Sequence, residues 1–143
     1  MTYTEIFEAD TAIVKPELVS VCELSIKEVV KTLNPHHTLS ELWEEIGCGS
    51  FLSGKDGNLL VDKINLLLMP EEVLELHEIA HMLDENTFDV GIPFFETSDM
   101  YHMVVTATGE IRYCTGTYVA ADMMEFFQEL MMDPIFYVER LVG

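Results

Sequence analysis

The chain has 143 residues, 49% of them hydrophobic, and its 26 acidic and seven basic residues give a formal net charge of −19. This length and apolar content suffice for the core of one domain over residues 1–143, which argues against a largely disordered chain. A surface of that sign repels phosphate backbones and anionic lipid headgroups, so neither nucleic acid nor a membrane is an expected partner. The charge would attract a basic protein, but the charge taken alone favours a merely well-solvated surface and names no partner.

The cysteines and the first residues of the chain indicate in which cellular compartment the protein is expected. Cys22, Cys48 and Cys114 are odd in number and form no CxxC pair, which predicts buried, reduced thiols. The opening residues, MTYTEIFEAD, lack both a basic region and an apolar run, and no later stretch approaches the roughly 18 apolar residues of a membrane helix. We therefore expect a cytoplasmic protein.

The first half of the chain predicts two helices. Apolar residues recur at helical spacing from Lys15 to Leu33, with Pro16 in the expected first turn. A second helix is expected from Thr38, whose hydroxyl would cap it with Glu41 as the reciprocal partner, to a stop at Gly47.

The middle of the chain predicts short strands and then a third helix. The apolar or β-prone runs expected to form strands are Ser50–Ser53, Leu59–Val61 and Ile64–Leu68. Pro70 is expected to begin a helix that extends to about Leu83 and carries Glu71 and Glu72 in its first turn, where negative charge suits the helix dipole.

The last third alternates with a period of two and predicts an antiparallel meander or hairpin. Its expected strands are Ile92–Thr97, Tyr101–Thr106 and Ile111–Cys114. A helix from about Val119 to Met132 and a short segment after Pro134 complete the chain. Together these elements predict the α+β class, with a central, antiparallel-rich sheet flanked by N-terminal, middle and C-terminal helices.

One motif in the sequence is typical of a catalytic metal site. His77-Glu78-Ile79-Ala80-His81 matches HExxH, the zinc-peptidase helix in which two histidines one turn apart bind the metal and the glutamate is the general base. The motif would make His77 and His81 the zinc ligands and Glu78 the base of a small zinc metallopeptidase.

Three features of the sequence oppose this interpretation. Asp84 and Thr87 stand where the extended motif needs a glycine and a third histidine. Glu125, the natural glutamate ligand from another helix, is expected to point away from the buried face of its helix. Finally, the two histidines fall at the edge of a stripe expected to be buried, which comprises Val73, Leu76, Ile79, Ala80 and Leu83. We therefore expect a structural helix, no metal or other cofactor, and no catalytic residues, with the zinc peptidase as the alternative.

Two other candidates have structural explanations. His36-His37 precedes a capped helix, where a role in the turn is favoured over metal binding. Gly47-Cys48-Gly49 is too short to bind a phosphate and predicts a helix stop followed by a tight turn.

Several stretches, in order, resemble those of a known family. Leu39–Phe51 is similar to a helix that ends in a glycine-rich turn and enters the first strand of that family. Asn65-Leu66 and Pro70–Val73 are like its strand leading into an acidic helix, and Ile92–Asp99 is like its central strand and turn. Over most of its length the chain thus resembles the SUKH superfamily (Smi/Knr-type), bacterial relatives of the yeast regulator of cell-wall glucan synthesis. Ser98-Asp99 stands where relatives often have Gly-Asp, which leaves the subgroup open.

Many members of this superfamily look like immunity proteins of toxin systems, and the family pattern contains no catalytic set. The resemblance implies a non-catalytic protein-binding domain, which would neutralise a basic, nuclease-like toxin or act as a related intracellular regulator. An adaptor without a toxin partner is a further alternative, and the oligomeric state stays open. The acid-rich segment expected to bind the partner comprises Glu71, Glu72, Glu75, Glu78, Asp84, Glu85 and Asp89.

Overall fold

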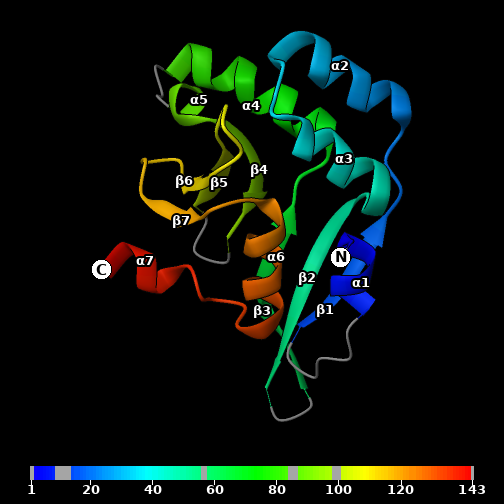
Figure 1. Cartoon of the computed structure of the whole chain (residues 1–143), viewed down its shortest axis with the longest axis vertical. Helices are drawn as coiled ribbons and strands as arrows, with labels where there is room; N and C mark the ends of the chain where they lie inside the picture. Colours follow the sequence, from blue (N-terminus) through cyan, green and yellow to red (C-terminus); the bar gives the residue numbers. More distant parts are fainter. Residues whose placement is uncertain (1, 9–13, 56–57, 84–86, 98–100, 143) are drawn as a thin grey trace.

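The computed structural model describes residues 2–8, 14–55, 58–83, 87–97 and 101–142, with the backbone alone at 53–55, 58–64, 81–83 and 142. The helices within these residues are α1 (Tyr3–Glu8), α2 (Glu23–Leu33), α3 (His37–Ile46), α4 (Pro70–Leu83), α5 (Thr87–Val90), α6 (Met123–Met132) and α7 (Val138–Val142) (Figure 1). The strands are β1 (Val14–Val19), β2 (Cys48–Lys55), β3 (Asn58–Leu67), β4 (Ile92–Glu96), β5 (His102–Val105), β6 (Ile111–Tyr113) and β7 (Tyr118–Ala120).

The strands form one antiparallel sheet in which each strand pairs with the next in the sequence, from β1 to β7. The runs expected at Ser50–Ser53, Leu59–Val61 and Ile64–Leu68 make one long hairpin, because β3 continues across the gap between the last two. Helices α2, α3 and α4 gather at one end of the molecule, and α6 crosses the sheet (Figure 1). The predicted α+β class with a central antiparallel sheet is confirmed.

The first predicted helix, Lys15–Leu33, is wrong in its first half. Val14–Val19 is an edge strand paired with β2, and the helix begins only at Glu23. Val14 is buried while Lys15 is exposed, and this alternation belongs to a strand. Pro16 lacks an N–H group, so it fits an edge strand as well as it fits a first helical turn. The spacing of the apolar residues alone does not distinguish a strand from a helix in this segment.

Two glycines let β1 lie against β2. Gly47 ends α3 with a φ of +81°, as expected, but β2 begins at once at Cys48, so the tight turn predicted there is wrong. A Cβ atom at Gly47 or Gly49 would collide with the carbonyl oxygen of Val19 or Glu17, respectively. Both positions therefore require glycine for close approach of the backbones.

The N-terminal cap of α3 differs from the prediction. His36, not Thr38, is the cap residue, and its Nδ1 accepts a hydrogen bond from the Thr38 backbone N–H at 3.4 Å. Glu41 instead contacts His37, with 2.9 Å between Oε1 and Nδ1. The two histidines thus have the structural role expected of them, but the Thr38–Glu41 capping box is not formed.

The last long helix also begins later than predicted. Val119 lies in β7, and α6 starts at Met123 after Asp122, whose Oδ1 accepts a hydrogen bond from the Glu125 N–H at 2.8 Å. Glu125 Oε2 in turn accepts from the Ala121 N–H at 3.0 Å. Val119 is buried because its strand lies in the sheet, which explains why its apolar side chain looked like part of the helical pattern.

An aromatic cluster joins α6 to the sheet and to α1. The Phe127 ring lies 5.6 Å from Phe51 of β2 and 6.1 Å from Phe95 of β4. On its other side it lies 5.3 Å from Phe7 and 6.2 Å from Tyr3, both on α1. All these distances join ring centroids and lie in the range at which aromatic pairs attract each other. One side chain of α6 therefore contacts both the sheet and α1.

A buried polar network fixes the segment after α6. The Tyr137 hydroxyl donates to Asn65 Oδ1 at 2.6 Å, and Asn65 Nδ2 donates to the Pro134 carbonyl at 2.8 Å. Tyr113 donates its hydroxyl to the Tyr137 carbonyl at 2.9 Å. Since buried polar groups are stable only when they are hydrogen-bonded, Asn65 and this segment require each other.

Phe127→Ala should lower the free energy of unfolding by about 3–5 kcal/mol, because it removes a fully buried ring from the contacts between α1, α6 and the sheet. Urea unfolding followed by far-UV circular dichroism measures the change. Met132→Ala is the matched control on the same helix, since Met132 is 76% exposed and should change stability by less than about 0.5 kcal/mol. Equal effects of the two substitutions would contradict this account of the core.

Candidate partner-binding surface

Helix α4 spans Pro70–Leu83, as predicted, and carries most of the expected acidic surface. Glu71, Glu75 and Glu78 are exposed, and Asp89 is exposed on the neighbouring α5. Glu72 is half-buried, and its Oε1 accepts a hydrogen bond from the Met69 N–H at 3.3 Å. Asp84 and Glu85 lie outside the described residues.

The outer face of α4 includes one side chain that was expected to be buried. Val73 is fully buried and Ala80 is 8% exposed, but Ile79 is 47% exposed. At about 100° per residue, Ile79 lies more than a quarter turn from the direction midway between Val73 and Ala80. The buried stripe is therefore narrower than predicted, and Ile79 lies among the carboxylates, one turn after Glu75.

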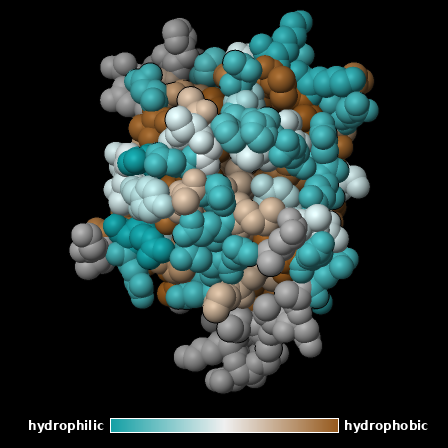
Figure 2. Space-filling view, in the orientation of Figure 1, coloured by the Kyte–Doolittle hydropathy of each residue, from teal (hydrophilic) through white to brown (hydrophobic). Residues whose placement is uncertain are grey.

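The acidic side chains of α4 and α5 are not neutralised locally. In the part of the chain that the structure describes, Glu71, Glu75, Glu78 and Asp89 form no ion pair with a basic side chain. The face of the molecule in Figure 2 is mostly hydrophilic, and apolar atoms form small patches between polar ones. A partner that approaches α4 thus meets unpaired negative charge around an exposed isoleucine.

The HExxH residues lie on α4, but the structure does not describe them all. The His77 ring packs edge-on against Phe88 of α5, with 4.9 Å between centroids, and Glu78 is exposed. Residue 81 follows one turn later on the helix, and its side chain is outside the described part. Among the described side chains, no group of three or more His, Cys, Asp or Glu could hold a metal ion.

Glu125, considered above as a third zinc ligand, and Glu129 on the same helix both have other contacts. Glu125 is half-buried and bonded to the backbone ahead of α6, so the prediction that it faces water was only partly correct. Glu129 forms an ion pair with Arg140 at 3.1 Å. Both carboxylates thus stabilise the C-terminal part of the fold.

The cysteines differ in environment, against the expectation that all three are buried. Cys22 is exposed beside the start of α2, Cys114 is half-buried, and Cys48 is buried at the start of β2. Burial raises the pKa of the Cys48 thiol, and the carboxylates of Glu72 and Glu71 raise this pKa further. A thiol of raised pKa is a poor nucleophile at neutral pH.

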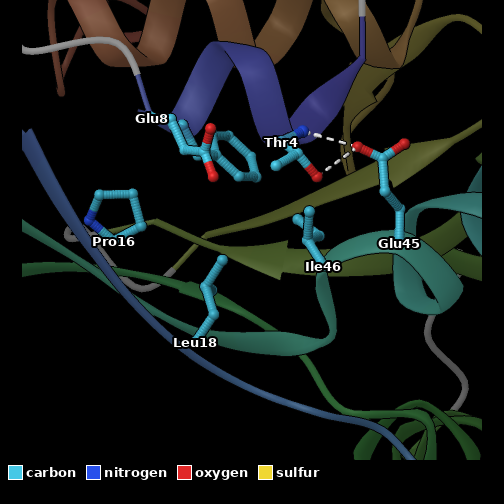
Figure 3. Close-up of a pocket in the computed structure, with 7 residues that line it drawn as sticks. Thr4, Glu8, Pro16, Leu18, Glu45 and Ile46 are labelled. Carbon is cyan, nitrogen blue, oxygen red and sulfur yellow. Dashed lines mark hydrogen bonds between the residues drawn. The ribbon is translucent and has the colours of Figure 1, made fainter.

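A hollow of 260 Å³ lies between α1, β1 and the end of α3 (Figure 3). Pro16, Leu18 and Ile46 line it with apolar atoms, and Glu8 and Glu45 bring carboxylates to it. Glu45 Oε2 also ties α3 to α1, because it accepts hydrogen bonds from the Thr4 N–H at 2.6 Å and the Thr4 hydroxyl at 2.9 Å. No motif in the sequence predicts this hollow, since its walls come from three separate elements.

Compared with known proteins, the chain matches no family model, no curated protein and no solved structure. The SUKH resemblance therefore stays a prediction based on the motifs alone. In the described part of the chain, no helix has the length and apolar character that crossing a membrane would require.

Iodoacetamide at pH 7.5 should modify Cys22 first and leave Cys48 almost untouched, because Cys48 is only 4% exposed and its pKa is raised. Mass spectrometry of the peptides measures the rates. Glu72→Gln with Glu71→Gln should speed modification of Cys48 by less than about tenfold, since burial is the larger cause of the shift. Modification of Cys48 in the unaltered protein as fast as that of Cys22 would contradict this environment.

Proposed function

We propose that this chain is a non-catalytic, cytoplasmic protein-binding domain whose acidic α4–α5 surface occludes a basic partner. In the form that the SUKH resemblance suggests, the partner is a basic, nuclease-like toxin and the chain is its immunity-type inhibitor. A related intracellular regulator would use the same surface on a different basic protein.

One observation carries the proposal: Ile79 is 47% exposed on the outer face of α4, among carboxylates that no described basic side chain neutralises. An exposed apolar side chain inside a charged surface is a typical anchor, because its burial supplies affinity when the partner covers it. The surrounding negative charge raises the association rate and favours a basic partner over others.

The net charge of −19 supports a basic partner over a neutral one. A field of this size accelerates association with a positively charged protein, and salt weakens it over a Debye length of roughly 8 Å at physiological ionic strength. A nuclease cleft is basic because it binds phosphates, so a carboxylate surface is chemically suited to occupy it.

Charge reversal on α4 should weaken binding to such a partner. The toxin candidate is the product of the adjacent gene, identified by rescue of growth on co-expression and then purified in a form without activity. Glu71→Lys, Glu75→Lys and Glu78→Lys together should slow association at low salt by at least tenfold, because they reverse three exposed charges. Surface plasmon resonance at several salt concentrations measures the rate.

The matched control reverses three exposed acidic residues elsewhere, Glu17, Glu28 and Glu139, and so changes the net charge equally. It should slow association much less than the α4 variant. Ile79→Ser should mainly raise the dissociation rate, because it removes the apolar anchor and leaves the charge unchanged. Binding that is insensitive both to salt and to charge reversal on α4 would contradict the electrostatic part of the proposal.

The zinc peptidase is a second candidate, favoured by one observation: residues 77 and 81 lie one turn apart on a continuous helix, as zinc binding by HExxH requires. This candidate predicts close to one zinc per chain in protein purified without a histidine tag, and loss of that zinc in His77→Ala. Our leading proposal predicts no stoichiometric zinc after incubation with the metal, as measured by plasma mass spectrometry. Stoichiometric, His77-dependent zinc would favour the enzyme.

A further inference from the structure

A second acidic feature lies away from α4. A cavity of 460 Å³ opens between α1, α3 and the start of α6. Its lining includes Glu41 and Glu45 from α3, Asp122 at the cap of α6, and Tyr3 from α1. None of the described residues that line it is basic. The volume falls within the range of pockets that hold a ligand or a large side chain.

Each of the three carboxylates is fixed by one of its oxygen atoms. Glu41 Oε1 lies 2.9 Å from His37 Nδ1, and Glu45 Oε2 accepts two hydrogen bonds from Thr4. Asp122 Oδ1 accepts from the backbone N–H three residues further on. Within the described part of the chain, the second oxygen of each carboxylate has no hydrogen-bond partner. Each side chain is thus held in place, and its second oxygen atom can accept a hydrogen bond from a ligand.

Tyr3 gives an independent indication that the cavity takes a ligand. The residue is 6% exposed, lines the cavity, and has no hydrogen-bond partner for its hydroxyl among the described residues. Every side-chain N or O atom that is sealed from solvent in the described part has a partner, so the Tyr3 hydroxyl is not sealed, and the cavity that Tyr3 lines gives a ligand a route to it. The Tyr3 side chain is thus nearly buried as a whole, while its hydroxyl stays accessible and can accept a hydrogen bond from a ligand.

The potential inside the cavity is negative. Burial raises the pKa of Tyr3 to about 12, and the carboxylates of Glu41, Asp122 and Glu45 contribute in that order. The same field that disfavours a phenolate favours a cation in the cavity. A ligand that fits this site is therefore positively charged and donates hydrogen bonds.

An organic cation fits this lining better than a metal ion does. The three carboxylates form no group that could hold a metal ion within the described residues. A guanidinium suits them better, because its planar fork presents five N–H donors in several directions and is more weakly hydrated than an ammonium. Free arginine fits less well, since its α-carboxylate would meet a lining with no described positive charge.

We propose that this cavity receives an arginine side chain of the basic partner, with Glu41, Glu45 and Asp122 around the guanidinium and the Tyr3 hydroxyl as a further acceptor. The inference rests on the proposed function and deepens it. The α4 surface attracts a basic protein of any kind, whereas the cavity selects one that presents an arginine in the right place.

The test uses a small mimic of an arginine in a peptide chain, N-acetyl-arginine-N′-methylamide, titrated into the ¹⁵N-labelled protein. Amide shifts should concentrate at the lining residues and should be absent with the neutral citrulline analogue. Glu41→Gln with Asp122→Asn should weaken binding at least tenfold, because hydrogen bonds to charged groups each contribute that order. Tyr3→Phe keeps the ring contact with Phe127 and should weaken binding several-fold.

Glu71→Gln with Glu75→Gln removes the same charge from α4 and is the matched control, which should bind the mimic nearly normally. Glu45 is left unchanged because its bonds to Thr4 hold α1 in place. Equal loss in the cavity and α4 variants would overturn the inference, since the mimic would then report overall charge. The same conclusion follows if the lysine analogue or free L-arginine binds more tightly than the mimic.

The proposed function and the cavity inference can be contradicted independently of each other. If the mimic does not shift the lining residues while charge reversal on α4 still impairs binding to the partner, the cavity inference fails and the proposed function stands. If the mimic binds in the cavity but neither α4 charge nor salt affects the partner, the electrostatic function fails and the cation site stands.

Discussion

The position of Phe127 is the constraint on which the rest of the structure depends. Its ring contacts Phe51 and Phe95 in the sheet and also Tyr3 and Phe7 on α1, so it supplies the apolar support of a short helix that the Thr4–Glu45 hydrogen bonds also hold in place. A helix of six residues is unstable alone and forms only where tertiary contacts support it. The wall of the acidic cavity that α1 supplies therefore exists because of an apolar contact beneath it.

The two acidic regions differ in the kind of recognition they offer. On α4, Glu71, Glu75 and Glu78 are exposed and form no ion pair with a described basic side chain, so salt would screen their long-range attraction for a cation. At the cavity, Glu41, Glu45 and Asp122 are exposed too, but each is restrained by a hydrogen bond, and Tyr3 is nearly buried beside them. Restrained groups lose less entropy on binding, which favours geometric selectivity over non-specific attraction. The two acidic regions thus differ in how far their carboxylates are restrained, although both are exposed.

The sequence predicted the elements whose signal is local. Helix α4 followed from Pro70 and the acidic first turn, and the alternating strands of the last third followed from their period of two. The errors at Val14–Val19 and Val119 have one cause: buried apolar residues in short strands are compatible with helical spacing when a helix follows closely. The cavity was missed because Tyr3, Glu41 and Asp122 are far apart in the chain and only tertiary packing joins them.

The strand order has a consequence for how the chain folds. Every strand pairs with its successor, and β4 to β7 do so across short connections, but the β1–β2 and β3–β4 pairings bridge the segments that contain α2–α3 and α4–α5. These long-range pairings must pay for loop closure before they stabilise the sheet. The docking of α1 on α6 closes a longer loop, which spans most of the chain. The acidic cavity needs this long-range docking in order to form, and a ligand bound there would stabilise the folded state by mass action.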